Sequence, residues 1–255
     1  EEARRIQTEL RSLVRTRHNE CDPCSIGYAG GADVAFITAG SSYDGDCHCR
    51  EDRTCAGGGL FVRTEREPVA IALSCVVVID TVTGEVVEKT CAAAPVYFPY
   101  VPGFLSFREG PAVLKAIGEL KKLPGVMVYD GCGIAHPRGF GLASHMSILT
   151  GIPSVGCAKS KLCGTCEEPD AVRGSWTPVV FQDETVGTCL RTRNNVRPVF
   201  VSPGSGFDIK GAREVVECLT YGYRLPEPTR LAHNYVTAYK KELLGRECIP
   251  AGRKC

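Results

Sequence analysis

The stretch VAIALSCVVVIDTVTGEVVEKTCAAAPVYF, residues 69–98, decides the fold class. It contains two apolar runs rich in Val, Ile and Thr, the residue types that favour strands. Thr83 and Gly84 lie between the runs and predict a tight turn, so the two strands form an antiparallel hairpin. Upstream, GYAGGADVAFITA predicts another strand at about 28–38. We therefore expect an antiparallel meander of three strands.

The period of the apolar residues changes after Phe107. REGPAVLKAIGELKKL predicts an amphipathic helix that ends at Pro124, and GVMVYDG predicts a buried strand that ends at Asp130. A loop and a helix follow, then IPSVGCAK as another buried strand, a less regular region, VGTCLRTR and RPVFVSPG as a late hairpin, and closing helices at 208–222 and 226–244. This order predicts an α/β, ribonuclease H-like fold, with a mixed central sheet flanked by helices.

Composition places few limits on function. The chain has 255 residues, 44% of them hydrophobic, and a net charge of +1, so its total charge neither favours nor excludes a nucleic-acid partner. No apolar run approaches the roughly 20 residues that span a bilayer. Residues 1–17 predict a charged amphipathic helix and not a secretion signal. We expect a cytoplasmic protein, or a nuclear one in a eukaryote, with no membrane partner.

Three acidic residues occupy special places in the predicted fold. Asp33 lies within the first strand, Asp130 ends the fourth, and Glu109 opens the helix between them. The first and fourth strands are neighbours in this fold, so Asp33 and Asp130 should face each other. Clustered carboxylates repel unless a cation neutralises them, and hard oxygen ligands suit Mg²⁺ or Mn²⁺. Any one of these acids alone would more often be a helix cap or a solvated residue, but together they predict a metal-dependent phosphodiesterase.

Six motifs occur in order along the chain: GADVAF, FPYVPGFLSFREGP, DGCGIAHPRGFGLASH, TGIPSVGCAKSKL, RPVFVSPG and RLPEPTRLAH. Together they resemble endonuclease V, the deoxyinosine-specific nuclease. The resemblance covers about residues 1–244, with gaps at 39–68 and around 163–185. It implies Mg²⁺-dependent cleavage of the second phosphodiester 3′ to a hypoxanthine base, which leaves 3′-OH and 5′-phosphate ends and initiates DNA repair. Inosine-containing DNA is the expected partner and a monomer the expected state.

The resemblance also implies roles for single residues. Asp33, Glu109 and Asp130 match the family's metal-binding acids, His233 matches its active-site histidine, and Lys159 matches a lysine near the scissile phosphate. Without the family, His233 would be read as a structural helical histidine. Lys159 would be read as an ordinary lysine at a strand end.

Two segments match the parts of the family that handle the lesion. The first is the wedge loop, which separates the strands and fills the gap left by the extruded base: Pro99, Tyr100, Val101, Pro102 and Gly103. A buried staple is the alternative for its tyrosine. The second is the base-pocket segment within residues 131–141, whose pocket residues would be Gly131, Cys132, Gly133, Ile134, His136 and Gly141. Cys132 departs from the family, which often has a polar residue there.

The fifteen cysteines form two groups. Without a secretion signal disulfides are not the first expectation, so the isolated cysteines should be small buried side chains: Cys75, Cys91, Cys132, Cys157, Cys189 and Cys218. The clustered cysteines have spacings compatible with Zn²⁺ or an iron–sulfur cluster: Cys21, Cys24, Cys47, Cys49 and Cys55. Disulfides and unligated thiols are the alternatives. The clustered group also includes Cys163 and Cys166, which form another C-x-x-C pair, and Cys248 and Cys255.

We expect a single nuclease domain over 1–255, with a Cys-rich hairpin insertion at about 39–68 and a short tail at 245–255. Two other functions remain open. One is cleavage of inosine in RNA, because the motifs do not separate DNA from RNA. The other is a non-cleaving, lesion-binding protein on a nuclease scaffold, against which the complete acid set argues. A Holliday-junction resolvase fits the fold but not the PYVPG and HPRGFG segments.

Overall fold

The computed structural model describes residues 1–16, 26–38 and 68–246. Several predictions fall outside these residues. They concern the Cys21 and Cys24 pair, the group of Cys47, Cys49 and Cys55, and nearly all of the 39–68 insertion and the 245–255 tail. Among the described helices, none combines the length and the apolar character needed to cross a membrane.

A mixed sheet forms the centre of the described structure. Its strands are β1 (Tyr28–Thr38), β2 (Ala70–Asp80), β3 (Val86–Val96), β4 (Val126–Tyr129), β5 (Ser154–Ala158), β6 (Trp176–Phe181), β7 (Glu184–Leu190) and β8 (Val199–Pro203). They lie in the order β3-β2-β1-β4-β5-β8-β7-β6. The first three strands pair antiparallel, and β1, β4 and β5 run parallel. The predicted meander and the predicted contact between the first and fourth strands are both confirmed.

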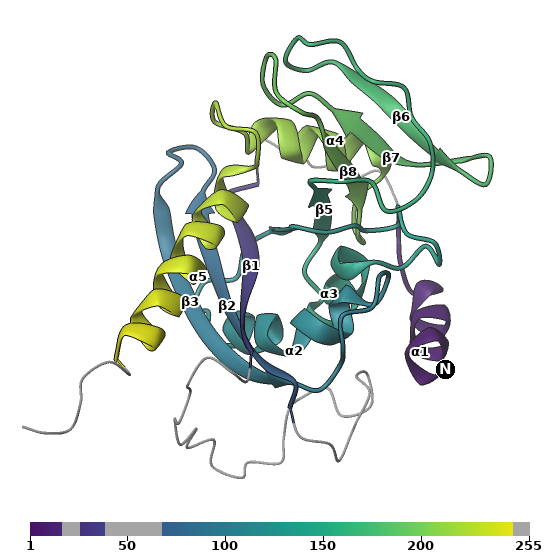
Figure 1. The fold of residues 1–255 in the computed structure, drawn as a ribbon. Coiled ribbons are helices and arrows are strands. Elements are labelled where there is room, and N and C mark those ends of the chain that lie inside the picture. The colour runs from purple at the N-terminus through teal and green to yellow at the C-terminus, as the bar shows by residue number, and fades with distance from the viewer. Residues whose placement is uncertain (17–25, 39–67, 247–255) are drawn as a thin grey trace, which may run out of the picture.

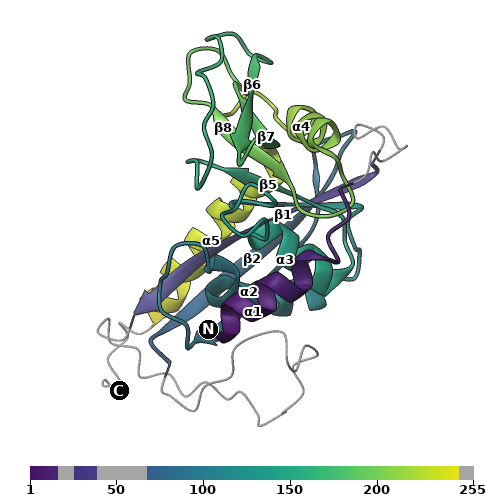
Figure 2. The same ribbon diagram turned by 90° about the vertical axis from the view of Figure 1, so that its right-hand side faces the viewer.

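Helices cover both faces of this sheet (Figure 1). They are α1 (Glu2–Arg11), α2 (Leu105–Gly118), α3 (Leu142–Thr150), α4 (Ile209–Cys218) and α5 (Glu227–Arg246). One core lies between the sheet and α4 and α5, and a second lies between the opposite face and α2 and α3. Figure 2 shows α1 beside α2 and α3, and the hairpin of β6 and β7 at the far end of the molecule.

Close backbone contact fixes α5 on β1. A Cβ atom at Gly31 would lie 2.3 Å from the carbonyl carbon of Pro228 and 2.4 Å from the backbone nitrogen of Thr229. Only glycine allows the first turn of α5 to approach the strand this closely. The position of α5 matters because this helix carries His233.

Four elements differ from the sequence prediction. Helix α4 ends at Cys218 and not at residue 222. The first helix ends at Arg11 and not at residue 17. Helix α2 begins at Leu105, so Glu109 lies inside it, not at its start; a proline is best tolerated in a first turn, and Pro111 therefore favoured a later start. Strand β6 was missed because it is a short, partly exposed edge strand that contains Pro178.

The expectation for Cys75 and Cys91 was wrong. The two residues face each other in the register of β2 and β3, with their Cα atoms 4.2 Å apart, and they form a disulfide. Cys218 is disulfide-bonded as well. Cys157 and Cys189 are buried free thiols, as predicted, whereas Cys132 is free and half-buried. Cys163 and Cys166 are also free, so this C-x-x-C pair is not a disulfide.

Candidate active site

Two strands bring Asp33 and Asp130 together. Ala32 of β1 is paired with Tyr129 of β4, and each aspartate follows this pair by one residue. Burial raises the pKa of Asp33, the hydrogen bond with His233 opposes this, and the negative charge of Asp130 raises it further. The two carboxylates are therefore close enough to repel each other, as the sequence predicted.

Glu109 reaches the same place from α2. Burial, and after it the charges of Asp33 and Asp130, raise the pKa of Glu109 to about 8. Three carboxyl groups from three different elements thus share one partly buried region. At neutral pH Glu109 keeps its proton, because a third negative charge beside Asp33 and Asp130 would be poorly solvated.

Two basic side chains border the acids. Nδ1 of His233, on α5, lies 2.7 Å from Oδ2 of Asp33, and the histidine side chain is 58% exposed. Nζ of Lys159, directly after β5, contacts Oδ2 of Asp130. Burial disfavours the charged lysine, but the hydrogen bond to Asp130 and the charges of Asp130 and Asp33 outweigh this and raise the pKa of Lys159. The structure therefore brings together all five residues predicted for catalysis.

The donor set fits a hard divalent cation by its chemistry. Asp33, Glu109 and Asp130 supply carboxylate oxygens, and a nearby cation would favour their ionised forms. In the described part of the chain, however, no three His, Cys, Asp or Glu side chains converge on one point at metal-binding distance. Asp33 and Asp130 are paired instead with His233 and Lys159.

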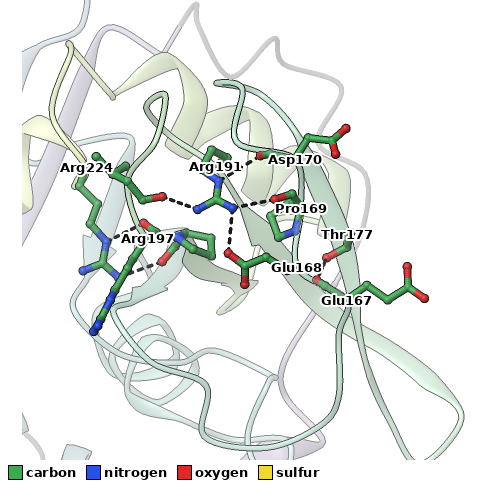
Figure 3. A network of polar contacts seen from close by, with 10 residues as sticks. Glu167, Glu168, Pro169, Asp170, Thr177, Arg191, Arg197 and Arg224 are labelled. Atoms are coloured by element: carbon green, nitrogen blue, oxygen red, sulfur yellow. Dashed lines mark hydrogen bonds and ion pairs between the residues drawn. The ribbon is translucent and has the colours of Figure 1, made fainter.

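Arg224 is a residue to which the sequence assigned no role. Its Nη2 donates to the carbonyl of Lys159 at 3.0 Å and to that of Pro198 at 2.8 Å, and its Nε donates to the carbonyl of Arg197 at 2.8 Å. Figure 3 shows this guanidinium beside Arg197. Arg224 therefore fixes the backbone that carries Lys159. Its place in RLPEPTRLAH, nine residues before His233, was the available signal.

A second arginine holds the neighbouring loop. Arg191 is buried, and it donates to the carbonyls of Asp170 (3.0 Å) and Pro169 (2.7 Å), to the carboxylate of Glu168 (2.8 Å) and to the carbonyl of Val196. Figure 3 shows these groups around one guanidinium. Because its donors are bound to the protein itself, Arg191 supports the loop and is not an anion site.

The wedge loop presents its tyrosine to solvent. Tyr100 is 71% exposed, whereas the rings of Phe98, Phe104 and Phe107 pack against one another at centroid distances of 5.6 to 6.1 Å. The phenylalanines form a core cluster with Ile6 of α1. They are the buried staple, and Tyr100 is not.

The glycines of the base-pocket segment have a packing role in this structure. A Cβ atom at Gly133 would lie 1.9 Å from the carbonyl oxygen of Pro203, and one at Gly141 would lie 2.3 Å from that of Cys132. The backbone N–H of Gly133 donates to Ser202 Oγ at 2.8 Å. These two glycines permit close approach of the chain to itself.

His136 and Cys132 are both uncharged. Nδ1 of His136 accepts from the backbone N–H of Arg138 at 3.1 Å, so Nε2 carries the proton and donates to the carbonyl of Gly103 at 2.9 Å. Burial lowers the pKa of His136 to about 4. Burial, followed by Cys163 and Asp130, raises the pKa of the Cys132 thiol to about 12. His136 thus connects the base-pocket segment to the wedge loop, and both of its nitrogens are engaged.

Asp33 lies within β1, Asp130 follows the adjacent parallel strand β4, and Glu109 reaches them from α2. This set of acids, on a sheet with this strand order, defines a nuclease of the ribonuclease H-like class. The chain belongs to the endonuclease V family, whose sequence model, described as Endonuclease V, matches residues 46–234. That range contains Glu109, Asp130, Lys159 and His233, and Asp33 precedes it. The protein is therefore an endonuclease, a hydrolase.

Individual relatives agree with this assignment. Endonuclease V of Roseiflexus sp. is 52% identical over 162 residues, which are 63% of this chain and 72% of the relative. The crystal structure of Endonuclease V from Streptomyces avermitilis is 39% identical with a TM-score of 0.77, covering 94% of this chain and 92% of that one. Endonuclease V of Ciona intestinalis, 22% identical with a TM-score of 0.70 over 93% of this chain and 95% of that one, shares the fold.

Proposed function

We propose that this protein is a Mg²⁺-dependent endonuclease that recognises deoxyinosine in DNA and hydrolyses the second phosphodiester bond 3′ to it. The products would carry 3′-OH and 5′-phosphate ends and would initiate repair of deaminated adenine. The observation that carries the proposal is the meeting of Asp33, Glu109 and Asp130 beside Lys159 and His233. The Ciona intestinalis relative was solved with DNA that contains an inosine followed by a ribo-adenosine, which supports the choice of substrate.

Each side chain has a defined task in this proposal. Asp33, Glu109 and Asp130 would hold Mg²⁺, or Mn²⁺ in its place, and the ion would supply activation of water and stabilisation of the developing charge. Lys159 is 44% exposed and would contact a phosphate oxygen of the substrate. His233 would orient Asp33 through their hydrogen bond and would face the attacking water from the solvent side.

The wedge loop would find and open the lesion. Tyr100 can stack on a base, and such stacking tolerates any sequence. The extruded hypoxanthine would then enter the pocket at the base-pocket segment, and extrusion costs less at a weakened base pair. Because Gly103 ends the wedge loop two residues before α2, which carries Glu109, recognition and cutting would share one stretch of chain.

A nicking assay tests the proposal. Duplexes with one deoxyinosine or one adenine, and an RNA with one inosine, would be incubated with Mg²⁺ or Mn²⁺. We expect nicking only next to inosine, and a loss of at least about a thousandfold in Asp33→Ala and Asp130→Ala. Glu119→Ala, at an exposed glutamate after α2, is the matched control and should cut normally.

Three results would contradict it. Intact deoxyinosine DNA with the wild-type protein in both metals would refute the nuclease assignment. Cutting of RNA but not of DNA would assign the protein to edited RNA. Tight binding of deoxyinosine DNA without cutting would identify a lesion-binding protein on a nuclease scaffold.

We further infer that the chain acts as one nuclease domain and as a monomer. The described strands form one continuous sheet, which supports a single domain. Light scattering of the free protein tests the monomer, and a dimer mass would overturn it.

A further inference from the structure

We propose that the N-terminal helix α1 sets the position of the wedge loop relative to the base-pocket segment, and that Gln7 is the positioning residue. The inference rests on the proposed function of these two segments and adds a third element to lesion recognition. It comes from a set of polar contacts at the base of the wedge loop.

One buried amide joins the two segments. Gln7 is 1% exposed, and its Nε2 donates to the carbonyl of Gly103 at 3.0 Å and to that of Phe140 at 3.2 Å. Its Oε1 accepts from Nε of Arg138. Gly103 ends the wedge loop, whereas Arg138 and Phe140 belong to the base-pocket segment. The amide therefore uses both donors and its acceptor to connect parts of the chain that are 96 and 133 residues away.

The carbonyl of Gly103 is the centre of these contacts. Besides Gln7, it accepts from Nε2 of His136 at 2.9 Å and from Nη2 of Arg138 at 2.6 Å. Gly103 has a φ of +80°, and an added Cβ would lie 2.9 Å from Nη2 of Arg138. The guanidinium of Arg138 also stacks on the ring of Phe104, 4.2 Å from its centroid. The end of the wedge loop is thus fixed in direction and in distance.

Apolar contacts also hold α1 in place. Ala3 and Ile6 pack against Phe104 and Phe107 on the buried face of the helix. A buried amide costs free energy unless it is hydrogen-bonded, so an apolar side chain would serve attachment at least as well. The amide of Gln7 does what an apolar residue does not do: it fixes two backbone carbonyls and one guanidinium relative to each other.

This arrangement matters when the loop meets a duplex. Insertion of Tyr100 between stacked bases pushes the loop back toward the protein, and the contacts at Gly103 resist that push. They also keep the loop at a constant distance from the pocket that receives the extruded base. Single-stranded DNA has no opposite strand to separate, so the same contacts are less important there.

Gln7→Met tests the inference, because it keeps the length of the side chain and removes its hydrogen bonds. In single-turnover nicking of duplex deoxyinosine DNA, we expect the half-saturating protein concentration to rise roughly tenfold while the rate at saturation changes by less than about twofold. On single-stranded deoxyinosine DNA both values should stay near those of the wild type. A 2-aminopurine next to the lesion should show weaker fluorescence enhancement on binding, since fewer bases are unstacked.

Ile6→Ala is the matched control, since it loosens the same helix without touching the amide contacts. It should lower the melting temperature. The ratio of the half-saturating protein concentration on duplex DNA to that on single-stranded DNA should stay at the wild-type value. If Gln7→Met does not fold, as judged by circular dichroism, Gln7→Glu keeps the contact with Arg138, removes both donors and should show the same ratio change. An unchanged ratio in the Gln7 variants overturns the inference, whereas a wild-type protein that cuts neither substrate overturns the proposed function instead.

Discussion

Glu109→Gln is expected to remove a pH dependence of stability that the wild-type protein shows without divalent ions. Burial and the neighbouring Asp33 and Asp130 raise the pKa of Glu109 from 4.5 to about 8. Above pH 4.5 the unfolded chain releases this proton while the folded chain keeps it. The unfolding free energy therefore falls as the pH rises, and the fall ends once the pH passes about 8.

The interval from pH 6.5 to 8 isolates this effect. Burial lowers the pKa of His136 to about 4, so below pH 6.5 the unfolded histidine binds a proton that the folded one does not, and stability then falls with falling pH. Above pH 6.5 His136 no longer contributes. One pKa unit corresponds to about 1.4 kcal/mol, so Glu109 should remove about 2 kcal/mol of stability across this interval.

Urea unfolding in EDTA at pH 6.5 and pH 8 measures the difference. The wild-type protein should lose about 2 kcal/mol more than Glu109→Gln between the two pH values. Glu119→Gln, at the exposed end of the same helix, should behave as the wild type does. Under the proposed function, saturating Mg²⁺ should flatten the wild-type dependence. If the unfolding free energies of the wild type and of Glu109→Gln, both in EDTA, change equally between pH 6.5 and pH 8, the raised pKa of Glu109 is refuted.

Three other variants test the geometry. Tyr100→Ala should change the unfolding free energy by less than about 0.5 kcal/mol but weaken duplex deoxyinosine binding roughly tenfold in an anisotropy titration; a large loss of stability would mean that the ring is structural. Cys75→Ala with Cys91→Ala should lower the unfolding free energy by about 3 kcal/mol in oxidising buffer. Dithiothreitol should narrow this difference between the wild type and the variant, and an unchanged difference would contradict the disulfide. Gly31→Ala should clash with Pro228, lower the unfolding free energy by about 1–3 kcal/mol and reduce nicking because α5 is displaced. Normal nicking activity in this variant would contradict the role given to Gly31.

Local sequence signals were sufficient for most of the fold. The runs of Val, Ile and Thr in β1, β2 and β3 predicted the meander, and short apolar runs predicted the parallel strands. The start of α2 was missed because its N-cap is Phe104, which offers no side-chain hydrogen bond. The Cys75–Cys91 disulfide had a signal that went unused: both cysteines are eight residues from Thr83, so the predicted hairpin already paired them.

The candidate site needed more than local signals. Asp33 and His233 are 200 residues apart, and only the family resemblance placed them together before the structure did so. Gln7 had a signal in the sequence, because it follows Ala3 by four residues and shares the buried face of α1 with Ile6. A polar residue among apolar ones on such a face requires hydrogen-bond partners, but the sequence does not identify them.

The charges of the site link a metal ion to proton release under the proposed function. Asp33 and Asp130 already face His233 and Lys159, so a divalent cation would compete with these side chains for the carboxylate oxygens. Glu109 would have to lose the proton that it keeps up to about pH 8. Asp33, Glu109 and Asp130 would hold the cation, which would neutralise their charge, and Lys159 would then be free to leave Asp130 and contact the phosphate of the substrate. Under the proposed function, the lysine that balances the charge of Asp130 in the free protein would therefore be the one that contacts the phosphate during cutting.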